Sequence, residues 1–338
     1  MKTQYANAVT QYENGTSLGG RIIKEGGLVV FPTETVYGLG ANGLNSEAVL
    51  KIFAAKGRPA DNPLILHIAK KSELKPLWSH VPDNARILAD TFWPGPLTMI
   101  FNRSSIVPDE VTAGLDTVAV RMPLNKTARA LINAAGVPIA APSANLSGKP
   151  SPTTAEHVRQ DMDGRVDLII DGGPCKYGLE STVVSLIGRP TILRPGAVTK
   201  EMLEAVIGPV DVAHAVLSPL REGETAASPG MKYRHYAPDA EVVVAEGKER
   251  EIAAKICREY DAREAAGEDC IIFATKQTQP FYRGRNCVII GDRTEPATLC
   301  ASLFYSLREY GDRADVIFAE ALPNDDMGLA YMLSLIHI

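Results

Sequence analysis

The sequence has few cysteines, no long apolar run and no large excess of charge of either sign. Its five cysteines include no Cys-x-x-Cys pair and no histidine at zinc-ligand spacing, which excludes a disulfide scaffold and a zinc finger. No stretch reaches the roughly 18 apolar residues of a membrane helix, and the N-terminus lacks the apolar segment of a signal peptide. The formal net charge of -5 argues against a general nucleic-acid binder. We therefore expect a cytoplasmic protein with free thiols.

The apolar content is sufficient for two compact domains. The 338 residues are 45% hydrophobic and 22% charged, a balance typical of globular proteins. A chain of this length exceeds the roughly 250–300 residues at which single cores stop growing. The charge is uneven, because residues 1–208 carry 21 Lys and Arg against 19 Asp and Glu, whereas residues 209–338 carry 14 against 21. Chemistry on an anionic substrate is therefore expected in the first part.

The first 208 residues alternate short apolar runs with amphipathic stretches, which predicts an α/β domain with a mixed sheet. The predicted strands are Leu28–Phe31, Leu64–Ile68, Leu97–Phe101, Thr117–Arg121, Pro138–Ala141, Leu168–Ile170, Thr182–Leu186 and Thr191–Arg194. The predicted helices are Ser46–Ala55, with Ser46 as its cap, Asp83–Thr91, Asn125–Ala135, Thr154–Gln160 and Lys200–Ile207.

A segment rich in Pro, Gly and Ser follows, and then the alternation of strands and helices returns. The later strands are predicted at Glu241–Ala245, Cys270–Ala274, Cys287–Ile290 and Val316–Ala319, with a charged helix that ends at Ala266 and another over Glu295–Tyr310. We interpret residues 1–208 as one domain, 209–240 as an ordered linker and 241–338 as a small Rossmann-like α/β domain.

One glycine motif imitates a dinucleotide-binding turn. Gly38, Gly40 and Gly43 form the pattern G-x-G-x-x-G, but six residues separate it from the preceding strand and no acidic residue ends the second strand. We interpret it as a glycine-rich turn that packs a strand against a helix. The sequence also lacks a complete P-loop and a G-x-S-x-G nucleophile elbow.

Polar residues follow or end several predicted strands and helices. Lys56 and Arg58 precede a proline in a short loop, where a lysine and an arginine suit a polyphosphate; exposed ion pairs with nearby acids would explain them equally. Alternation in Thr117–Arg121 places Arg121 on the face of Thr117 and Ala119, so it points into a pocket and needs a partner. That partner is either a ligand anion or an acid elsewhere in the chain.

Two further polar positions have a structural and a functional interpretation. Ser143 and Asn145 flank one small residue, so that hydroxyl, amide and backbone N–H groups there can surround an anion, or else cap a helix or form an Asx turn. His67 lies inside an apolar strand, where a core histidine bonded to backbone is the simpler interpretation.

Taken together, the motifs resemble the threonylcarbamoyl-AMP synthase family, whose signature is K-x-R followed much later by S-x-N. Lys56/Arg58 and Ser143/Asn145 match that signature, within the ordered segments FPTETVYGLG, KGRP, DNPLILHI, TVAVRMP, APSANLSGKPSPT, ESTVV and ILRPG. The resemblance covers about residues 15–208, and SPGMKYRHYAP resembles the linker of two-domain members. Residues 328–338 depart from the family because they are apolar rather than rich in Asn, Arg and Lys, so the C-terminus is expected to be truncated or misread.

The resemblance implies that the chain converts L-threonine, bicarbonate and ATP, with Mg²⁺, into L-threonylcarbamoyl-adenylate and pyrophosphate. It implies a twisted mixed sheet around a large, positively charged concave cavity, and a linker that covers the active site. The implied catalytic residues are Lys56, Arg58, Ser143 and Asn145. The implied ATP-binding residues are Arg58, Asn62, Thr117, Ser143, Ser151, Arg194 and, in the linker, Tyr236. The implied threonine-binding residues are Thr35, His67, Arg121, Ala141 and Ser181. The implied partners are the tRNA threonylcarbamoyl-transfer machinery and, weakly, tRNA.

Two other function classes remain open on the sequence. A double-stranded-RNA or ribosome-assembly protein would use the same basic cavity without catalysis, but a net charge of +2 over residues 1–208 is small for binding a phosphate backbone. A carbamoyl-transfer enzyme would act on carbamoyl phosphate and would not need threonine. Release of pyrophosphate that depends on both threonine and bicarbonate distinguishes the first reading from these two.

Overall fold

The structure is a computed structural model that describes all residues except 1, 11, 218–237, 324–325 and 337–338. The chain divides into two compact units. The first contains residues 1–147, 151–176 and the described residues from 180 to 217, and the second contains residues 148–150, 177–179 and the described residues from 238 onward. Two short segments from the first 208 residues, 148–150 and 177–179, therefore belong to the second unit.

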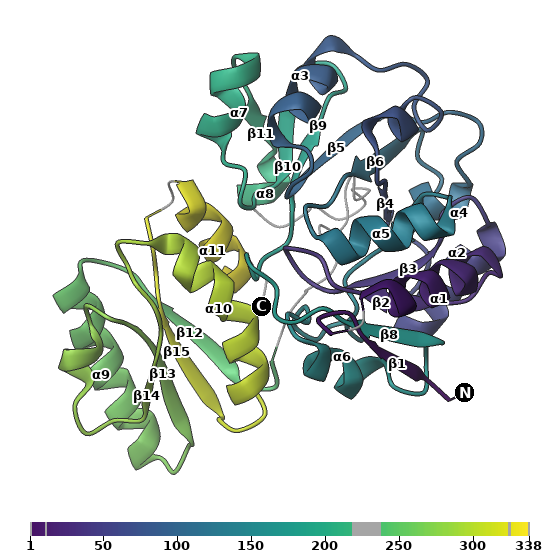
Figure 1. Cartoon of the computed structure of the whole chain (residues 1–338). Helices are drawn as coiled ribbons and strands as arrows, with labels where there is room; N and C mark the ends of the chain where they lie inside the picture. The colour runs from purple at the N-terminus through teal and green to yellow at the C-terminus, as the bar shows by residue number, and fades with distance from the viewer. Residues whose placement is uncertain (1, 11, 218–237, 324–325, 337–338) are drawn as a thin grey trace. The chain divides into compact units, whose positions relative to one another are not determined.

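The strands described in the first unit form one 11-stranded mixed sheet in the order β1-β8-β2-β3-β7-β4-β6-β5-β9-β10-β11 (Figure 1). These strands are β1 (Gln4–Asn7), β2 (Val29–Phe31), β3 (Gly38–Asn42), β4 (Ile65–His67), β5 (Leu97–Asn102), β6 (Thr117–Arg121), β7 (Ile139–Ala141), β8 (Leu168–Asp171), β9 (Thr182–Ser185), β10 (Thr191–Arg194) and β11 (Asp211–Val212). The helices are α1 (Tyr12–Lys24), α2 (Ser46–Lys56), η1 (Lys71–Leu74), α3 (Asp83–Phe92), α4 (Asp109–Thr112), α5 (Lys126–Ala135), α6 (Ala155–Met162), α7 (Lys200–Ile207) and α8 (His214–Leu217).

The two faces of this sheet are covered unequally. One face packs on the main core, to which α2, α3, α6 and α7 contribute. On the other face α1 and α5 cover the part formed by β2, β7 and β8. Over β4, β6, β5 and β9 the same face carries a small cluster of Ile65, Ile100, Ala119 and Val183, with Leu193 packed against it. Polar side chains on this part of the face are therefore not surrounded by a large apolar core.

The eight strands predicted before residue 208 are confirmed to within one or two residues, but the interpretation of the glycine motif is wrong. Gly38–Asn42 is strand β3, antiparallel to both β2 and β7, rather than a turn between a strand and a helix. A Cβ on Gly40 would lie 2.7 Å from Ile139 Cγ2, and one on Gly43 would lie 2.4 Å from Leu66 Cδ2. Glycine is present because neighbouring side chains lie against the backbone of β3.

The predicted helices are confirmed, with one correction to a cap. Asn45, not Ser46, caps α2, because its side chain accepts a hydrogen bond from the Ala48 backbone N–H at 3.0 Å. Thr154 and Asn125 lie at the predicted starts of α6 and α5 and act as caps there. The sequence interpretation missed β1 and α1, and it placed residues 211–217 in the linker, whereas they form β11 and α8.

The second unit contains a parallel sheet in the order β12-β15-β13-β14. Its elements are β12 (Glu241–Ala245), α9 (Glu249–Ala265), β13 (Cys270–Thr275), η2 (Gln279–Tyr282), β14 (Cys287–Gly291), α10 (Pro296–Tyr310), β15 (Val316–Glu320) and α11 (Asp326–Ile336). Helix α9 lies on one face of the sheet, and α10 and α11 lie on the other (Figure 1). The apolar C-terminal residues are explained by α11, which buries Tyr331, Met332 and Leu335.

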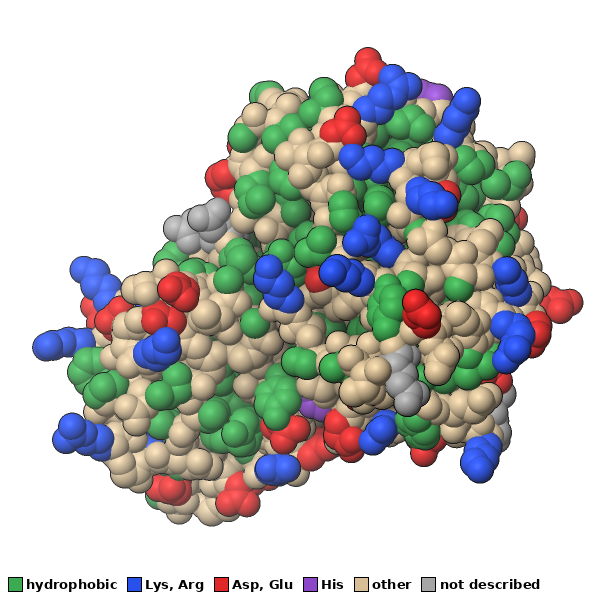
Figure 2. Space-filling model, in the orientation of Figure 1, with side chains coloured by type: hydrophobic (Ala, Val, Ile, Leu, Met, Phe, Trp, Pro, Cys, Tyr) green, Lys and Arg blue, Asp and Glu red, His purple; other side chains and the backbone are tan. Residues whose placement is uncertain are grey.

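The surface shows mixed charge. On the face drawn in Figure 2, Lys and Arg side chains are interspersed with Asp, Glu and hydrophobic side chains. Within the described part of the chain, no helix has the length and apolarity required to cross a bilayer.

Candidate active site

Most of the predicted threonine-binding residues lie on the thinly covered face of the first sheet. His67 on β4 pairs with Arg121 on β6, and Ile65 pairs with Ala141 on β7. Since paired residues share a face, His67, Arg121 and Ala141 all lie on the face opposite the main core. The predicted alternation in β6 is confirmed, because Val118 and Val120 belong to the main core and Ala119 to the small cluster.

The K-x-R and S-x-N motifs meet directly. Lys56, the last residue of α2, is only 3% exposed. Its Nζ donates to the backbone carbonyls of Ser143 at 2.5 Å and Asn145 at 2.6 Å, and to Asn145 Oδ1 at 3.3 Å. Lys56 is therefore a buried lysine rather than a surface lysine. It joins the end of α2 to a loop that lies 87 residues or more away in the sequence.

Arg58 and Asn62 lie in the loop between α2 and β4. Arg58 Nη2 donates to the Asn62 carbonyl at 3.1 Å. The Asn62 side chain is fully buried, and neither its oxygen nor its nitrogen has a hydrogen-bond partner among the described residues. A buried amide is normally satisfied, so this one is suited to a ligand. Because β4 and β6 are parallel, Thr117 at the start of β6 lies on the same side of the sheet's strand ends as this loop, which leads into the start of β4.

Arg121 has the acidic partner that the sequence left open. Its Nη2 donates to Glu34 Oε1 at 2.6 Å, its Nη1 to Thr35 Oγ1 at 2.9 Å and its Nε to the Gly95 carbonyl at 3.4 Å. Arg121 and Glu34 form a buried ion pair, with each side chain 4% exposed. The structural interpretation of Arg121 is thus correct, and it does not exclude a ligand, because a guanidinium has five N–H donors.

His67 is held neutral. Its Nδ1 lies 3.2 Å from the Ile65 carbonyl, as expected for a core histidine bonded to backbone. Burial, and then the positive charge of Arg121, lowers the pKa of His67 to about 3. At neutral pH His67 can therefore act as a hydrogen-bonding group but not as a cation.

This pKa predicts a pH-dependent stability. As the pH falls from about 6.5 towards 3, the unfolded chain takes up a proton at His67 that the folded chain does not, so the free energy of unfolding decreases by up to about 1.4 kcal/mol per pH unit. We expect the variant His67→Gln to lack this contribution. Urea unfolding of both proteins at pH 7, 6 and 5 measures how the free energy of unfolding depends on pH. The same dependence in both proteins would contradict a neutral His67 in the folded chain.

Arg194, Ser181 and Ser151 form a second connected group. Arg194 donates from Nε to the Ser181 carbonyl and from Nη2 to Ser181 Oγ, both at 3.0 Å. Glu180 accepts a hydrogen bond from Ser151 Oγ at 2.9 Å and lies 3.7 Å from Arg194 Nη1. Ser181 Oγ also lies 2.8 Å from Thr98 Oγ1, and Thr98 pairs with Arg121 across β5 and β6. The predicted nucleotide-binding and threonine-binding residues are therefore contiguous here.

The predicted site residues thus form two groups at opposite ends of β4 and β6. Thr117 and Arg121 are the two ends of β6 and lie four residue steps, about 13 Å of strand, apart. Backbone pairing connects the groups, since Ser143 forms a bridge with Gly38, which follows the loop that carries Thr35. Tyr236 lies outside the described residues.

Three residues of this arrangement had no role in the sequence interpretation. Glu34 and Glu180 were included only within the quoted segments FPTETVYGLG and ESTVV, and Thr98 was given no role. Their contacts span 87 residues for Glu34 and Arg121 and 83 for Thr98 and Ser181. The single available signal was that a buried arginine requires an acid or an anionic ligand.

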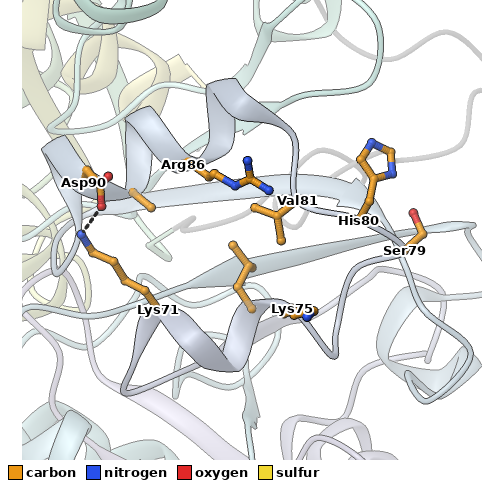
Figure 3. A pocket seen from close by; sticks show the side chains of 9 residues that line it. Lys71, Lys75, Ser79, His80, Val81, Arg86 and Asp90 are labelled. Atoms are coloured by element: carbon orange, nitrogen blue, oxygen red, sulfur yellow. Dashed lines mark hydrogen bonds and ion pairs between the residues drawn. The ribbon is translucent and has the colours of Figure 1, made fainter.

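A separate cavity of about 680 Å³ lies between η1 and α3. Figure 3 shows Lys71 and Asp90 facing each other across it, with their charged atoms 2.7 Å apart. Its lining residues are Lys71, Leu74, Lys75, Ser79, His80, Val81, Arg86, Ala89 and Asp90. None of them is a predicted site residue, so this cavity is distinct from the arrangement above.

Comparison with known proteins identifies the family of this chain. Two family profiles match, one described as "Telomere recombination" over residues 21–196 and one described as "Threonylcarbamoyl-AMP synthase, C-terminal domain" over residues 198–333. A threonylcarbamoyl-AMP synthase of Bacillus subtilis is 47% identical over 314 residues, which cover 92% of this chain and 89% of the relative. The chain belongs to the threonylcarbamoyl-AMP synthase family.

Other members of this family are equally similar. A threonylcarbamoyl-AMP synthase of Pyrococcus abyssi is 48% identical over 313 residues, which cover 92% of this chain and 89% of the relative. A solved structure described as "Crystal structure of P. abyssi Sua5 complexed with L-threonine" superposes with a TM-score of 0.93 at 44% identity, covering all of this chain and 97% of that one. The family assignment made from the motifs is therefore confirmed.

Proposed function

We propose that this chain forms L-threonylcarbamoyl-adenylate and pyrophosphate from L-threonine, bicarbonate and ATP, for threonylcarbamoyladenosine modification of tRNA. The observation that carries the proposal is the meeting of Lys56 with Ser143 and Asn145 in a chain of this family. The buried amide of Asn62, which has no partner among the residues that the structure describes, lies beside Arg58 and supports a ligand at the same place.

We assign each residue the role that the resemblance to the family implies. Arg58, Asn62, Thr117, Ser143, Ser151 and Arg194 bind ATP, together with Tyr236 of the linker. Thr35, His67, Arg121, Ala141 and Ser181 bind threonine. Lys56, Arg58, Ser143 and Asn145 carry the catalytic step. We propose that these residues line one concave, positively charged cavity, in which Lys56, Arg58, Arg121 and Arg194 outnumber Glu34 and Glu180.

The chemistry requires positioning and charge rather than a side-chain nucleophile. Arg121 holds the threonine carboxylate and leaves the amine free to attack the carbon of bicarbonate, which forms a carbamate with loss of water. A carbamate oxygen then attacks the α-phosphorus of ATP, and the bond to the β-phosphate oxygen breaks, so that pyrophosphate leaves. Lys56, Arg58 and Arg194 stabilise the charge that develops on the phosphates. His67, being neutral, donates or accepts a hydrogen bond without adding charge.

Mg²⁺ is expected to enter with ATP. Among the residues that the structure describes, no group of three or more His, Cys, Asp and Glu side chains could hold a metal ion. This fits Mg²⁺, which usually binds one or two carboxylates together with substrate phosphates and water. Glu180, next to Ser151 and Arg194, is the carboxylate that would face it. Bound in this way, Mg²⁺ would neutralise phosphate charge.

The product is a mixed anhydride, so a second protein must receive it before water does. We propose that the tRNA threonylcarbamoyl-transfer machinery consumes it, that contact of this chain with tRNA is weak, and that the reaction takes place in the cytoplasm, where ATP and tRNA are available. The balance of 21 Lys and Arg against 19 Asp and Glu over residues 1–208 suits small substrates better than a phosphate backbone.

A direct product assay tests the function. Purified full-length chain with ATP, threonine, bicarbonate and Mg²⁺ should give threonylcarbamoyl-adenylate, identified by mass spectrometry, together with equimolar pyrophosphate. Omission of threonine or of bicarbonate should abolish both products. Pyrophosphate release that persists without threonine would contradict the proposal, as would binding of double-stranded RNA without any adenylate formation.

A further inference from the structure

Glu34 is a buried acid beside the proposed threonine site to which no substrate contact is assigned. It is 5% exposed and lies in the loop between β2 and β3. Burial alone would raise the pKa of its carboxyl group, but the charge and hydrogen bonds of Arg121 outweigh burial and hold the pKa below its usual value. Glu34 is therefore a carboxylate at neutral pH.

Both oxygens of this carboxylate are used by the protein itself. Oε1 accepts from Arg121 Nη2 at 2.6 Å. Oε2 accepts from the backbone N–H groups of Leu124 at 2.9 Å and Asn125 at 3.2 Å. Asn125 is the residue that caps α5. Glu34 thus ties the guanidinium to the start of a helix, which is a rigid reference point.

The remaining contacts of Arg121 complete this restraint. Thr35 Oγ1 and the Gly95 carbonyl accept two further hydrogen bonds, so within the described part of the chain three of the five N–H donors are engaged and two remain. Two N–H groups are what one carboxylate can accept in a bidentate contact. The protein therefore leaves Arg121 the donor capacity for a single carboxylate.

The ion pair also changes which anions Arg121 attracts. Oppositely charged atoms at 2.6 Å largely cancel each other for a third charge several ångströms away. Arg121 therefore presents little net positive charge to a multiply charged phosphate, while its remaining N–H groups can still donate hydrogen bonds.

We propose that Glu34 is a positioning and specificity residue that reserves Arg121 for the carboxylate of the amino-acid substrate. It fixes the orientation of the guanidinium and cancels its charge, so that a singly charged carboxylate binds there and polyphosphate does not. This inference rests on the proposed function, because it takes threonine as the occupant of the Arg121 site and ATP as the occupant of the neighbouring one.

The test is kinetic and uses the full chain with the substitution Glu34→Gln. We expect the KM for threonine to rise by about tenfold, which corresponds to about 1.4 kcal/mol of binding, while the KM for ATP changes less than about twofold. Pyrophosphate, which should not compete with threonine in the unsubstituted protein, should become a competitive inhibitor against threonine. If Glu34 had a purely structural role, the substitution would lower kcat or weaken the binding of threonine and ATP alike. Pyrophosphate would then still not compete with threonine.

The matched control is Asp90→Asn, which neutralises an acid paired with Lys71 at 2.7 Å but 75% exposed. It should leave the KM for threonine, the KM for ATP and the inhibition by pyrophosphate unchanged.

Should Glu34→Gln fail to fold, a second variant is available. Glu34→Asp keeps the charge but shortens the side chain, and it should raise the KM for threonine without making pyrophosphate a competitive inhibitor. An unaltered threonine KM and inhibition pattern in a folded variant would overturn the inference. Threonine binding measured by calorimetry without ATP separates this outcome from failure of the proposed function, which the product assay reports.

Discussion

The substitution Lys56→Met should reduce kcat/KM for adenylate formation by about 10²- to 10³-fold, the loss expected when one preorganised charged donor is removed from a transition state. Lys56 is buried, and its ammonium joins the Ser143 and Asn145 loop to the end of α2. Methionine keeps the length and the apolar stem but removes the charge and all three hydrogen bonds. The carbonyls left unpaired should lower the free energy of unfolding by about 1–3 kcal/mol.

Lys51→Met provides the matched control because it changes the same residue type on the same helix. Lys51 Nζ also donates to a backbone carbonyl, that of Gly26 at 2.7 Å, but Lys51 is exposed and lies outside the site. Its activity should remain within about twofold of the unsubstituted protein, well below the tenfold that 1.4 kcal/mol represents. Adenylate formation by mass spectrometry and urea unfolding measure both variants, and a Lys56→Met protein as active as the control would exclude a catalytic role for Lys56.

The largest loss of stability is expected from Glu320→Ala in the second unit. Glu320 ends β15 and is 1% exposed. Its carboxylate accepts hydrogen bonds from Thr275 Oγ1 at 3.2 Å, from Thr278 Oγ1, from the Tyr282 hydroxyl at 2.9 Å and from Arg293 at 3.4 Å. Removing it leaves a cation and several buried donors without their acceptor, which costs about 3–5 kcal/mol.

Amide hydrogen exchange of Glu320→Ala locates this effect. Protection of the backbone amides should fall first in β13, η2 and β15, because the carboxylate of Glu320 on β15 bonds to Thr275 on β13 and to Tyr282 on η2. Glu259→Ala is the matched control, because Glu259 lies 3.7 Å from Arg263 on α9 and its side chain is 53% exposed. An exposed pair at i,i+4 contributes only about 0.2–0.5 kcal/mol. Equal stability losses for the two variants would show that the Glu320 network does not hold this unit together.

The sequence predicted elements well where one physical pattern was sufficient. Strand β6 has its predicted bounds, because its alternation matches a sheet with a core on one face. Strand β1 was missed because Gln4–Asn7 is an exposed edge strand with no buried apolar face. Strand β3 was predicted as a turn because glycines are typical of turns, whereas here they allow neighbouring side chains to pack against a strand.

The site was predicted residue by residue from the motifs, but its connections were not. The sequence indicated that Arg121 needs an anionic partner. Glu34 lies 87 residues away, and the sequence alone does not distinguish it from the other Asp and Glu residues of the chain. Likewise, the motifs predicted that Lys56 contacts phosphate, whereas its contacts with the loop of Ser143 and Asn145 are known only from the structure.

The amino-acid sequence by itself determined the family, the kinds of side chain available for adenylation and the positions of most strands and helices, because these depend on local pattern and on motif order. Only the tertiary structure decided which charges neutralise one another and which donors remain for substrates. Those properties depend on distances of a few ångströms between segments far apart in the chain, and on burial, which strengthens each pairing by excluding water.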